Sequence, residues 1–362
     1  MPYSENFIIV AVVVGSANAP DVVGARRDHS YHRLRVARVT TETADASSFA
    51  LDVPPDLAET FAYSAGQFCT FKVDVDGTDH VRCYSMSSTP GLDAELAVTV
   101  KRVPGGIVSN RLVDSLTVGD EIDVASPAGF FQLTDDPGDV VAYAAGSGIT
   151  PIFSLLKAAL ATTTRRVWLL YANRDAESVI FATQLADLAR TNPDRLAVID
   201  HFDVEHGYVD EATVTSLLGQ ATDATCYVCG PTPFMDVVES ALLGHGMESD
   251  RIHIERFTPA QPAVPDESPD GGAVLVTIEL DGRTASTEHR PGTTILQAAR
   301  QAGLAPPFSC ESGSCATCMA RLVEGEVTMR VNNALTPDEV ADGWVLTCQS
   351  VPSSVAVRVV YD

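Results

Sequence analysis

The chain lacks a long apolar run and is poor in positive charge, and both shortages narrow its possible functions. Its 362 residues include 24 Lys and Arg against 48 Asp and Glu, a formal net charge of −24 at pH 7. A membrane-spanning helix needs about 20 consecutive apolar residues, so we expect no such helix. Binding to nucleic acid or to an anionic membrane requires basic surface, which no part of this chain supplies. The acidity suits either solubility or docking to a basic face of a protein partner.

Several catalytic patterns are also missing. The eight histidines form no H-x-x-x-H pair or cluster, and no Ser/His/Asp nucleophile pattern is visible, so neither a histidine metal site nor a hydrolase is predicted. The eight cysteines are not interpreted as disulfides, because a long chain with metal-type cysteine spacing fits a reducing, cytoplasmic compartment. Cys226 and Cys229 have C-x2-C spacing but no further ligands, and Cys69 and Cys83 are expected in the core.

The first thirty residues do not match the pattern of the remaining chain. Phe7–Val14 is apolar, and Ala17-Asn18-Ala19 is similar to a signal-peptide cleavage site, but Met1–Asn6 has no Lys or Arg. A signal peptide needs a positively charged start, so export is not predicted. Strand-like alternation begins only near Tyr31, and we therefore expect residues 1–30 to be a disordered extension or the result of an upstream mis-start.

Four cysteines near the C-terminus carry the most specific pattern. Cys310, Cys315 and Cys318 have the spacing C-x4-C-x2-C, and Cys348 follows after 29 further residues. Two irons bridged by two sulfides need four thiolates, and this is the plant-type spacing for a [2Fe-2S] cluster. The pattern predicts that these four cysteines are metal ligands and that the protein transfers single electrons.

The length predicts two or three domains. Residues 31–135 read as short alternating strands with turns, which favours an antiparallel β-barrel. Residues 136–257 alternate apolar strands with helices, which predicts a doubly wound parallel sheet. Residues 258–272 are rich in Pro, Asp and Gly and read as a linker. Residues 273–362 read as a hairpin, a helix, the cysteine loop and closing strands.

Two motifs in the α/β region are candidates for nucleotide binding. Gly146-Ser147-Gly148-Ile149-Thr150-Pro151 follows an apolar strand and opens a helix. Glycines let the backbone approach a pyrophosphate, and the helix N-terminus supplies free N–H groups. The third glycine of G-x-G-x-x-G is absent, and a plain tight turn remains an alternative. Cys229-Gly230-Pro231 ends a later strand, at the sheet edge where such folds bind ligands.

The barrel region has two further candidate motifs. Arg82-Cys83-Tyr84-Ser85 ends a predicted strand, where Arg82 can pair with a phosphate. Tyr84 shares its face and offers a ring for stacking, and Ser85 offers a hydroxyl. The second motif, Gly105-Gly106-Ile107-Val108-Ser109-Asn110, begins a predicted helix whose N-terminus could bind an anion. Taken alone, the first motif is also typical of an ordinary strand with a surface arginine. The second, taken alone, is also typical of a simple hairpin loop.

The order of the motifs is more specific than any one of them. Arg-x-Tyr-Ser, Gly-x-x-Ser-Asn, Gly-x-Gly-Ile-Thr-Pro and Cys-Gly-Pro in succession resemble the ferredoxin–NADP reductase family. With the cysteine module at the C-terminus, residues 31–362 resemble reductase components of multicomponent oxygenases, such as those of 3-ketosteroid 9α-hydroxylases and phenylacetyl-CoA epoxidases. The resemblance implies an FAD-binding barrel over 31–135, an NAD(P)H-binding domain over 136–257 and a β-grasp ferredoxin domain over 273–362.

The resemblance also implies roles for single residues. Arg82 and the Gly106–Ser109 turn would hold the FAD pyrophosphate, while Tyr84 and Ser85 would contact the isoalloxazine, with Ser85 near its N5. Cys229 would lie near the nicotinamide during hydride transfer, so Ser85 and Cys229 are the candidate catalytic residues. The full set of candidate cofactor-binding residues is Arg82, Tyr84, Ser85, Gly106, Val108, Ser109, Gly146, Gly148, Thr150, Pro151, Cys229, Gly230, Pro231 and Phe257.

The combination predicts a relay from NADH through FAD and the [2Fe-2S] cluster to a partner protein, because a flavin can accept a hydride and release single electrons. NADH is predicted over NADPH because residues 200–211 hold several acids and no Lys or Arg to meet a 2′-phosphate; Arg174 is the open exception. The expected acceptor is a Rieske-type terminal oxygenase. The alternatives are a di-iron oxygenase as acceptor, or a plain electron carrier without NADH activity of its own.

Overall fold

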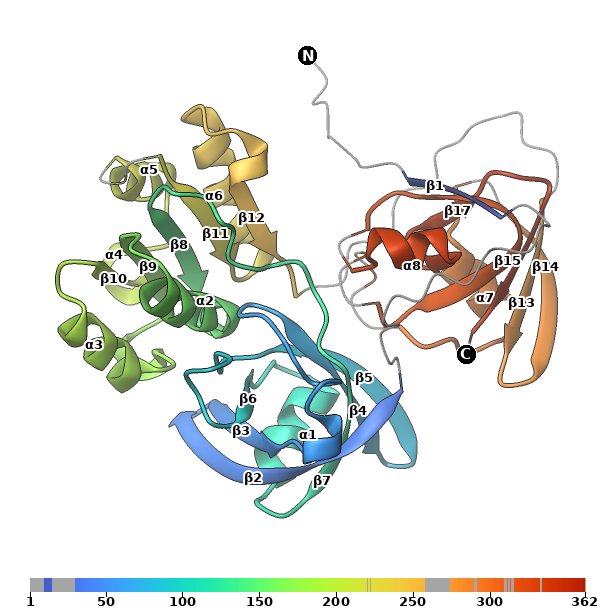
Figure 1. The fold of residues 1–362 in the computed structure, drawn as a ribbon, viewed down its shortest axis with the longest axis horizontal. Coiled ribbons are helices and arrows are strands. Elements are labelled where there is room, and N and C mark those ends of the chain that lie inside the picture. Colours follow the sequence, from blue (N-terminus) through green and yellow to red (C-terminus); the bar gives the residue numbers. More distant parts are fainter. Residues whose placement is uncertain are drawn as a thin grey trace. The chain divides into compact units, whose positions relative to one another are not determined.

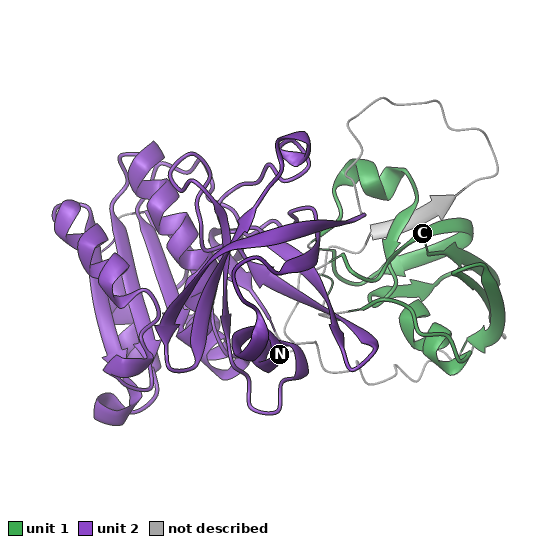
Figure 2. Ribbon diagram, turned by 90° about the horizontal axis from the view of Figure 1, so that it is seen from below, with its two compact units in different colours: residues 1–26, 258–362 green, residues 27–257 purple. Residues whose placement is uncertain are grey.

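The computed structural model describes most of the chain, in two compact units. The described residues are 10–14, 30–219, 221, 223–257, 274–289, 292–308, 311, 313, 316–332 and 334–361. Residues 27–257 make up the larger unit, and residues 1–26 together with 258–362 make up the smaller one (Figure 2). Within the described residues, no helix is both long enough and apolar enough to cross a membrane.

A six-stranded antiparallel sheet forms the first half of the larger unit. The strands pair in the order β5-β4-β7-β2-β3-β6, and a bridge between Met86 and Val98 joins the two edge strands, so the sheet closes into the predicted barrel. Leu34, Phe71 and Val124 are fully buried in its core. The elements are β2 (Tyr31–Thr43), β3 (Ala46–Asp52), β4 (Phe68–Val75), β5 (Thr78–Ser85), β6 (Leu96–Lys101), α1 (Ile107–Ser115) and β7 (Glu121–Ala125).

Five parallel strands form the second half of this unit, in the order β10-β9-β8-β11-β12 (Figure 1). The chain runs outward from β8 to β10 and then returns to place β11 on the other side of β8. This is the predicted doubly wound sheet, with its switch point between β8 and β11. The strands are β8 (Val140–Ala145), β9 (Val167–Asn173), β10 (Leu196–Phe202), β11 (Thr225–Cys229) and β12 (Ile252–Glu255). The helices are α2 (Ile149–Thr162), α3 (Ala182–Thr191), α4 (Asp203–His206), α5 (Glu211–Leu218) and α6 (Thr232–Gly244).

Both faces of the parallel sheet are buried, which explains the nearly continuous apolar run at Val140–Ala145. Ala142 and Ala144 belong to a core cluster with α2 and α3. Val141 and Tyr143 point the other way, into a cluster with α5 and α6. Strands covered by helices on both faces need apolar residues at every position, not at alternate ones.

The smaller unit is built on a sheet in the order β1-β15-β18-β13-β14, in which β1 is Val10–Val14, and β16 and β17 also pair with β15. The predicted hairpin is present, and its turn residues Asp281 and Gly282 have φ values of 51° and 71°, which a two-residue turn requires. Thr294 and Gln297 cap the following helix reciprocally. The elements are β13 (Val274–Leu280), β14 (Arg283–His289), α7 (Ile295–Gln301), β15 (Met319–Met329), α8 (Pro337–Ala341), β16 (Trp344–Leu346), β17 (Ser350–Pro352) and β18 (Ala356–Val360).

The N-terminal segment contains a strand that the sequence did not predict. Val10–Val14 forms β1 and pairs antiparallel with β15, with Val12 opposite Val327. A run rich in valine has high strand propensity and can extend a sheet edge. The expected disorder of residues 1–30 is therefore wrong for residues 10–14. The linker at 258–272 lies outside the described residues, and the domain boundaries stay a prediction.

Candidate functional site

The predicted flavin strand is β5, whose last four residues carry the Arg-x-Tyr-Ser motif. The guanidinium of Arg82 is exposed, and its Nη1 donates to the carbonyl of Val81 at 2.7 Å. The ring of Tyr84 packs edge-on against Phe71, with ring centroids 5.4 Å apart. Burial raises the pKa of Tyr84, so its hydroxyl stays protonated. Arg82 and Tyr84 lie two residues apart on the strand and therefore share a face.

Ser85 ends this strand with a buried hydroxyl. The residue is 2% exposed, and its Oγ has no hydrogen-bond partner among the described residues. A buried hydroxyl without a partner costs about 1–3 kcal/mol, so its environment fits a ligand that supplies the missing bond. A flavin ring offers nitrogen and oxygen atoms of the required kind, and the residues present therefore fit the predicted cofactor.

The second predicted phosphate-binding turn lies at the start of α1. Gly106 is the N-cap residue, and a Cβ there would lie 2.5 Å from Ser109 Oγ. Ser109 Oγ accepts a hydrogen bond from the backbone N–H of Val103 at 3.2 Å, which closes the turn. Val108 is 1% exposed and anchors the helix in the barrel core. Only glycine fits beside this hydrogen bond, and its lack of a side chain leaves the helix N–H groups accessible to a phosphate.

The predicted nucleotide turn connects β8 to α2. Gly146–Gly148 forms a short 3-10 helix, and Gly146 has a φ of 53°. The hydroxyl of Thr150 donates to the carbonyl of Ser147 at 3.0 Å. Pro151 lies in the first turn of α2, where a backbone N–H has no partner within the helix, so its missing donor is tolerated. The turn therefore presents the open helix N-terminus expected of an anion site.

The second α/β motif lies directly against this turn. A Cβ on Gly148 would lie 2.1 Å from the carbonyl oxygen of Cys229, and a Cβ on Gly230 would lie 2.9 Å from the Cβ of Ala145. Pro231 is the N-cap residue of α6. Glycine at both positions lets the loops after β8 and β11 touch at the switch point. The structure thus brings together the two motifs that were predicted to bind the nicotinamide nucleotide.

A lysine that the sequence analysis did not single out lies beside the same turn. The Nζ of Lys101, the last residue of β6, is 3.6 Å from the position of a Cβ on Gly146. The Nζ of Lys101 also lies 3.8 Å from Oδ2 of Asp45. A cation beside a helix N-terminus adds to its attraction for an anion. Lys101 belongs to a barrel strand rather than to the nucleotide motif, so no local sequence signal connects it with that motif.

Cys229 and Phe257 differ in how accessible they are. Cys229 ends β11 but is 0% exposed, and burial raises the pKa of its thiol well above the usual value, with the charge of Glu255 adding to the effect. The thiol is therefore neutral, and its predicted approach to a nicotinamide requires movement of the atoms that cover it. Phe257 is 39% exposed and follows β12.

The carboxyl end of β10 is acidic, as the coenzyme prediction requires. Helix α4 contains Asp203 and Glu205, and Asp210 caps α5 by accepting a hydrogen bond from the backbone N–H of Thr213 at 2.9 Å. At the end of the neighbouring strand, Arg174 Nε donates to Asp175 Oδ2 at 2.7 Å. The one cation considered for NADPH therefore already has a carboxylate partner.

In the smaller unit, strand pairing brings together the segments of the third and fourth cysteines. Cys318 immediately precedes β15, and Cys348 lies just after its antiparallel partner β16. The hydroxyl of Thr347 donates to the carbonyl of Cys318 at 2.7 Å. Cys318 is 2% exposed and Cys348 6% exposed, and the six cysteines within the described residues form no disulfide. Both side chains are therefore buried, on segments that strand pairing brings together.

The first two predicted ligands, Cys310 and Cys315, lie outside the described residues, and the described part contains no group of three metal-ligating side chains. Two neighbours in their loop are described. The carbonyl of Glu311 accepts a hydrogen bond from Gln349 Nε2 at 2.7 Å. A Cβ on Gly313 would lie 3.0 Å from Gln349 Cγ. These contacts fasten the described part of the cysteine loop to the residue that follows Cys348, which fits a shared cluster.

Three family models match successive parts of the chain. An oxidoreductase FAD-binding domain matches residues 33–133, an oxidoreductase NAD-binding domain residues 143–240, and a 2Fe-2S iron-sulfur cluster binding domain residues 278–353. The cofactors predicted from the motifs are thereby confirmed as FAD, a nicotinamide nucleotide and a [2Fe-2S] cluster.

Two similar proteins match nearly the whole chain. The chain is 40% identical to a 3-ketosteroid-9-alpha-monooxygenase ferredoxin reductase component from Mycolicibacterium smegmatis, over 91% of this chain and 96% of that protein. It is 35% identical to a component of the 1,2-phenylacetyl-CoA epoxidase from Escherichia coli, over 92% of this chain and 98% of that protein.

Solved structures agree with this arrangement. Phthalate dioxygenase reductase aligns with a TM-score of 0.58 and 27% identity, over 91% of this chain and 98% of that one. A self-sufficient cytochrome P450 monooxygenase shares the fold with a TM-score of 0.67 and 24% identity, over 95% of this chain and 43% of that one. The chain therefore belongs to the family of FAD- and [2Fe-2S]-containing oxidoreductases that serve as the reductase components of oxygenases.

Proposed function

We propose that this protein takes electrons from NADH and delivers them singly to a Rieske-type terminal oxygenase. When bound, FAD would supply the ability to exchange both a hydride and single electrons, and the [2Fe-2S] cluster would supply single-electron transfer. The flavin barrel and the nucleotide turn meet at Lys101 and Gly146 within one compact unit, on a chain that also contains the four-cysteine module.

The chain's own residues bind and orient. Arg82 and the Gly106–Ser109 turn hold the FAD pyrophosphate, and Ser85 supplies its unpaired hydroxyl to the flavin ring. The turn at Gly146–Pro151 holds the coenzyme pyrophosphate, with Lys101 adding charge. Cys229 acts as a neutral neighbour of the nicotinamide, not as a base, because its thiol stays protonated. The thiolates at Cys310, Cys315, Cys318 and Cys348 hold the cluster, chemistry that fits a cytoplasmic location.

NADH is the proposed donor because of the charge after β10. Asp203, Glu205 and Asp210 repel a dianionic 2′-phosphate, and Arg174 is engaged by Asp175. With ferricyanide as acceptor, kcat/KM for NADH should exceed that for NADPH by at least tenfold. The variant Asp203→Arg should lower the ratio of kcat/KM for NADH to that for NADPH. The variant Asp187→Arg, at an exposed position of α3, should leave this ratio unchanged. A wild-type ratio at or below one would contradict the choice of NADH.

The acceptor is the remaining question of function. The 40% identical relative is a component of a 3-ketosteroid-9-alpha-monooxygenase, which supports a terminal oxygenase of that kind. The 35% identical epoxidase component keeps a di-iron oxygenase as the second candidate. The test supplies NADH and this protein to each purified terminal component and measures oxygenated product. Product from the steroid system alone supports the proposal, whereas product from the epoxidase alone favours the second candidate.

A further inference from the structure

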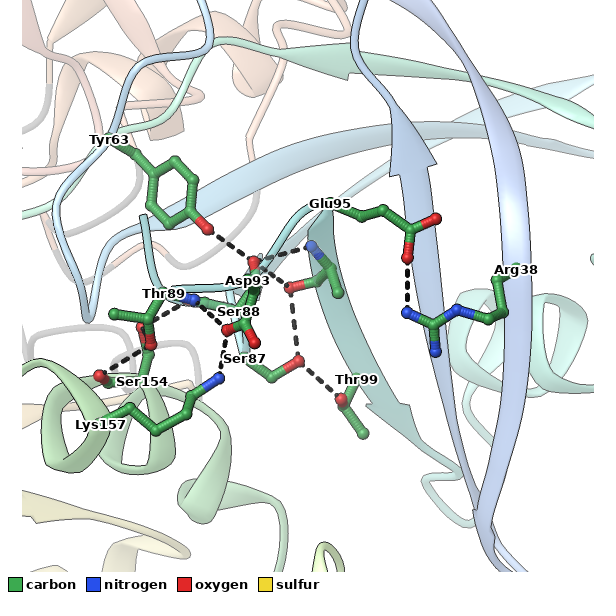
Figure 3. Close-up of polar contacts among 11 residues, drawn as sticks. Arg38, Tyr63, Ser87, Ser88, Thr89, Asp93, Glu95, Thr99, Ser154 and Lys157 are labelled. Carbon is green, nitrogen blue, oxygen red and sulfur yellow. Dashed lines mark hydrogen bonds and ion pairs between the residues drawn. The ribbon is translucent and has the colours of Figure 1, made fainter. Parts of the chain in front are cut away.

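The loop after the flavin strand is hydrogen-bonded to the helix that follows the nucleotide turn. Ser154, on the second turn of α2, donates its hydroxyl to the carbonyl of Ser88 at 2.6 Å. In return, the hydroxyl of Thr89 donates to the carbonyl of Ser154 at 3.1 Å. Ser88, Thr89 and Ser154 are 3%, 2% and 0% exposed. These reciprocal bonds, drawn in Figure 3, are shielded from water and join the barrel to the α/β half.

An ion pair completes this contact. Lys157, one turn further along α2, pairs with Asp93 of the same loop. The carboxylate of Asp93 also accepts a hydrogen bond from the backbone N–H of Thr89 at 2.6 Å, so one group holds both the loop and the helix. The ammonium of Lys157 also lies over the ring of Phe153, 4.6 Å from its centroid. Burial lowers the pKa of Lys157 and Asp93 opposes that effect, so the carboxylate helps to keep the lysine charged.

Both sides of the contact are rigidly connected to the cofactor sites. On the barrel side, Ser88 lies three residues after Ser85, and its hydroxyl accepts a hydrogen bond from the backbone N–H of Ala97 in β6 at 2.8 Å. On the other side, Ser154 is part of the helix that begins at Ile149, next to the nucleotide turn. Any shift of that turn relative to β5 must therefore break these bonds or bend a buried helix.

We propose that Ser88, Thr89, Asp93, Ser154 and Lys157, here called the lobe junction, are positioning residues that hold the nicotinamide-binding turn at its working separation from the flavin strand. This inference rests on the proposed function. Within the described residues, the side-chain hydrogen bonds and ion pair of these five residues are made with one another and with the barrel, not with the predicted cofactor motifs. They therefore act through β5 and α2. Hydride transfer is sensitive to such positioning, because a displacement of about 1 Å can cost about a hundredfold in rate.

The test measures hydride transfer separately from coenzyme binding. Wild-type holoprotein and the variants Lys157→Met and Ser154→Ala are mixed anaerobically with increasing NADH, and flavin bleaching is followed by stopped flow. We expect the limiting rate of flavin reduction to fall by about tenfold or more in both variants. The NADH concentration at half-maximal rate should change less than about threefold, with FAD and iron contents at wild-type levels. Lys157→Arg, which keeps the charge, should recover most of the rate.

A matched control is present in the same loop. Glu95 pairs with Arg38 at 2.5 Å, and this ion pair lies wholly within the barrel (Figure 3). The variant Arg38→Met should therefore keep the wild-type limiting rate. The positioning role of the lobe junction would be overturned if Lys157→Met and Ser154→Ala both kept the wild-type limiting rate. It would also be overturned if Arg38→Met lost as much of the limiting rate as they do. If NADH fails to reduce the flavin of the wild-type protein, that result would instead overturn the proposed function.

Discussion

Hydroxyl groups in the predicted site differ in whether the protein already uses them. Ser109 accepts a backbone hydrogen bond from Val103, and Thr150 donates to Ser147, so both hydroxyls shape the turns to which they belong. Ser85 alone of these three has a buried Oγ without a partner among the described residues. We infer that Ser109 and Thr150 act by presenting backbone N–H groups, and that Ser85 contacts its ligand through the side chain.

Arg82 is the residue whose replacement tests the flavin site most simply. Removing a charge-assisted hydrogen-bonding group costs about 1.5–3 kcal/mol, so Arg82→Ala should bind FAD roughly 10- to 150-fold more weakly while keeping its cluster. The measurement is the FAD-to-iron ratio of purified protein, together with FAD titration of the apoflavoprotein. Arg33→Ala is the control, because Arg33 is an exposed barrel arginine that pairs with Asp123 at 3.5 Å. Unchanged FAD affinity in Arg82→Ala would refute its phosphate role.

At the scale of elements, the parallel sheet brings into contact loops that are distant in the sequence. The turn after β8 and the loop after β11 are far apart along the chain, yet they meet because β8 and β11 are neighbours in the sheet. Their contact leaves no room for a side chain at Gly148. The same logic in the smaller unit places Cys318 near Cys348 through the pairing of β15 with β16.

The contact at Gly148 predicts a stability change. A methyl group there would lie 2.1 Å from the carbonyl oxygen of Cys229, and such overpacking costs about 1–3 kcal/mol. Gly148→Ala should lower the free energy of unfolding by this amount, measured by urea denaturation with far-UV circular dichroism. Gly219→Ala is the control, because the nearest atom to its added Cβ is at 3.6 Å. Equal stability of the two variants would show that the two loops do not touch closely.

The strand pairing in the smaller unit predicts how the cluster responds to mutation. Cys348→Ser should abolish the visible absorption of the cluster, because one of the four thiolates is lost, while reduction of ferricyanide by NADH through the flavin remains. Cys83→Ser serves as the control, since Cys83 lies in the barrel and should not affect iron content. An intact cluster spectrum in Cys348→Ser would remove this residue from the ligand set.

At the scale of the whole molecule, the chain joins a flavin and nucleotide unit to a ferredoxin module. Much of this organisation could be predicted, because cysteine spacing, the period of barrel strands and the apolar run at Val140–Ala145 are local signals. The lobe junction and the place of Lys101 beside Gly146 could not, because such contacts depend on how separate elements pack. The strand at Val10–Val14 was missed for a similar reason: its valines indicate a strand only once β15 offers an edge.

If the proposed relay is present, NADH reduces both the flavin and the cluster of one chain. An anaerobic NADH titration of purified protein, followed by absorbance, measures both reductions in one experiment. A flavin takes two electrons and a cluster one, so complete reduction should need about 1.5 equivalents of NADH per chain, with the flavin and cluster bands both bleached. Bleaching of the flavin alone, ending at about one equivalent while dithionite still reduces the cluster, would contradict the relay.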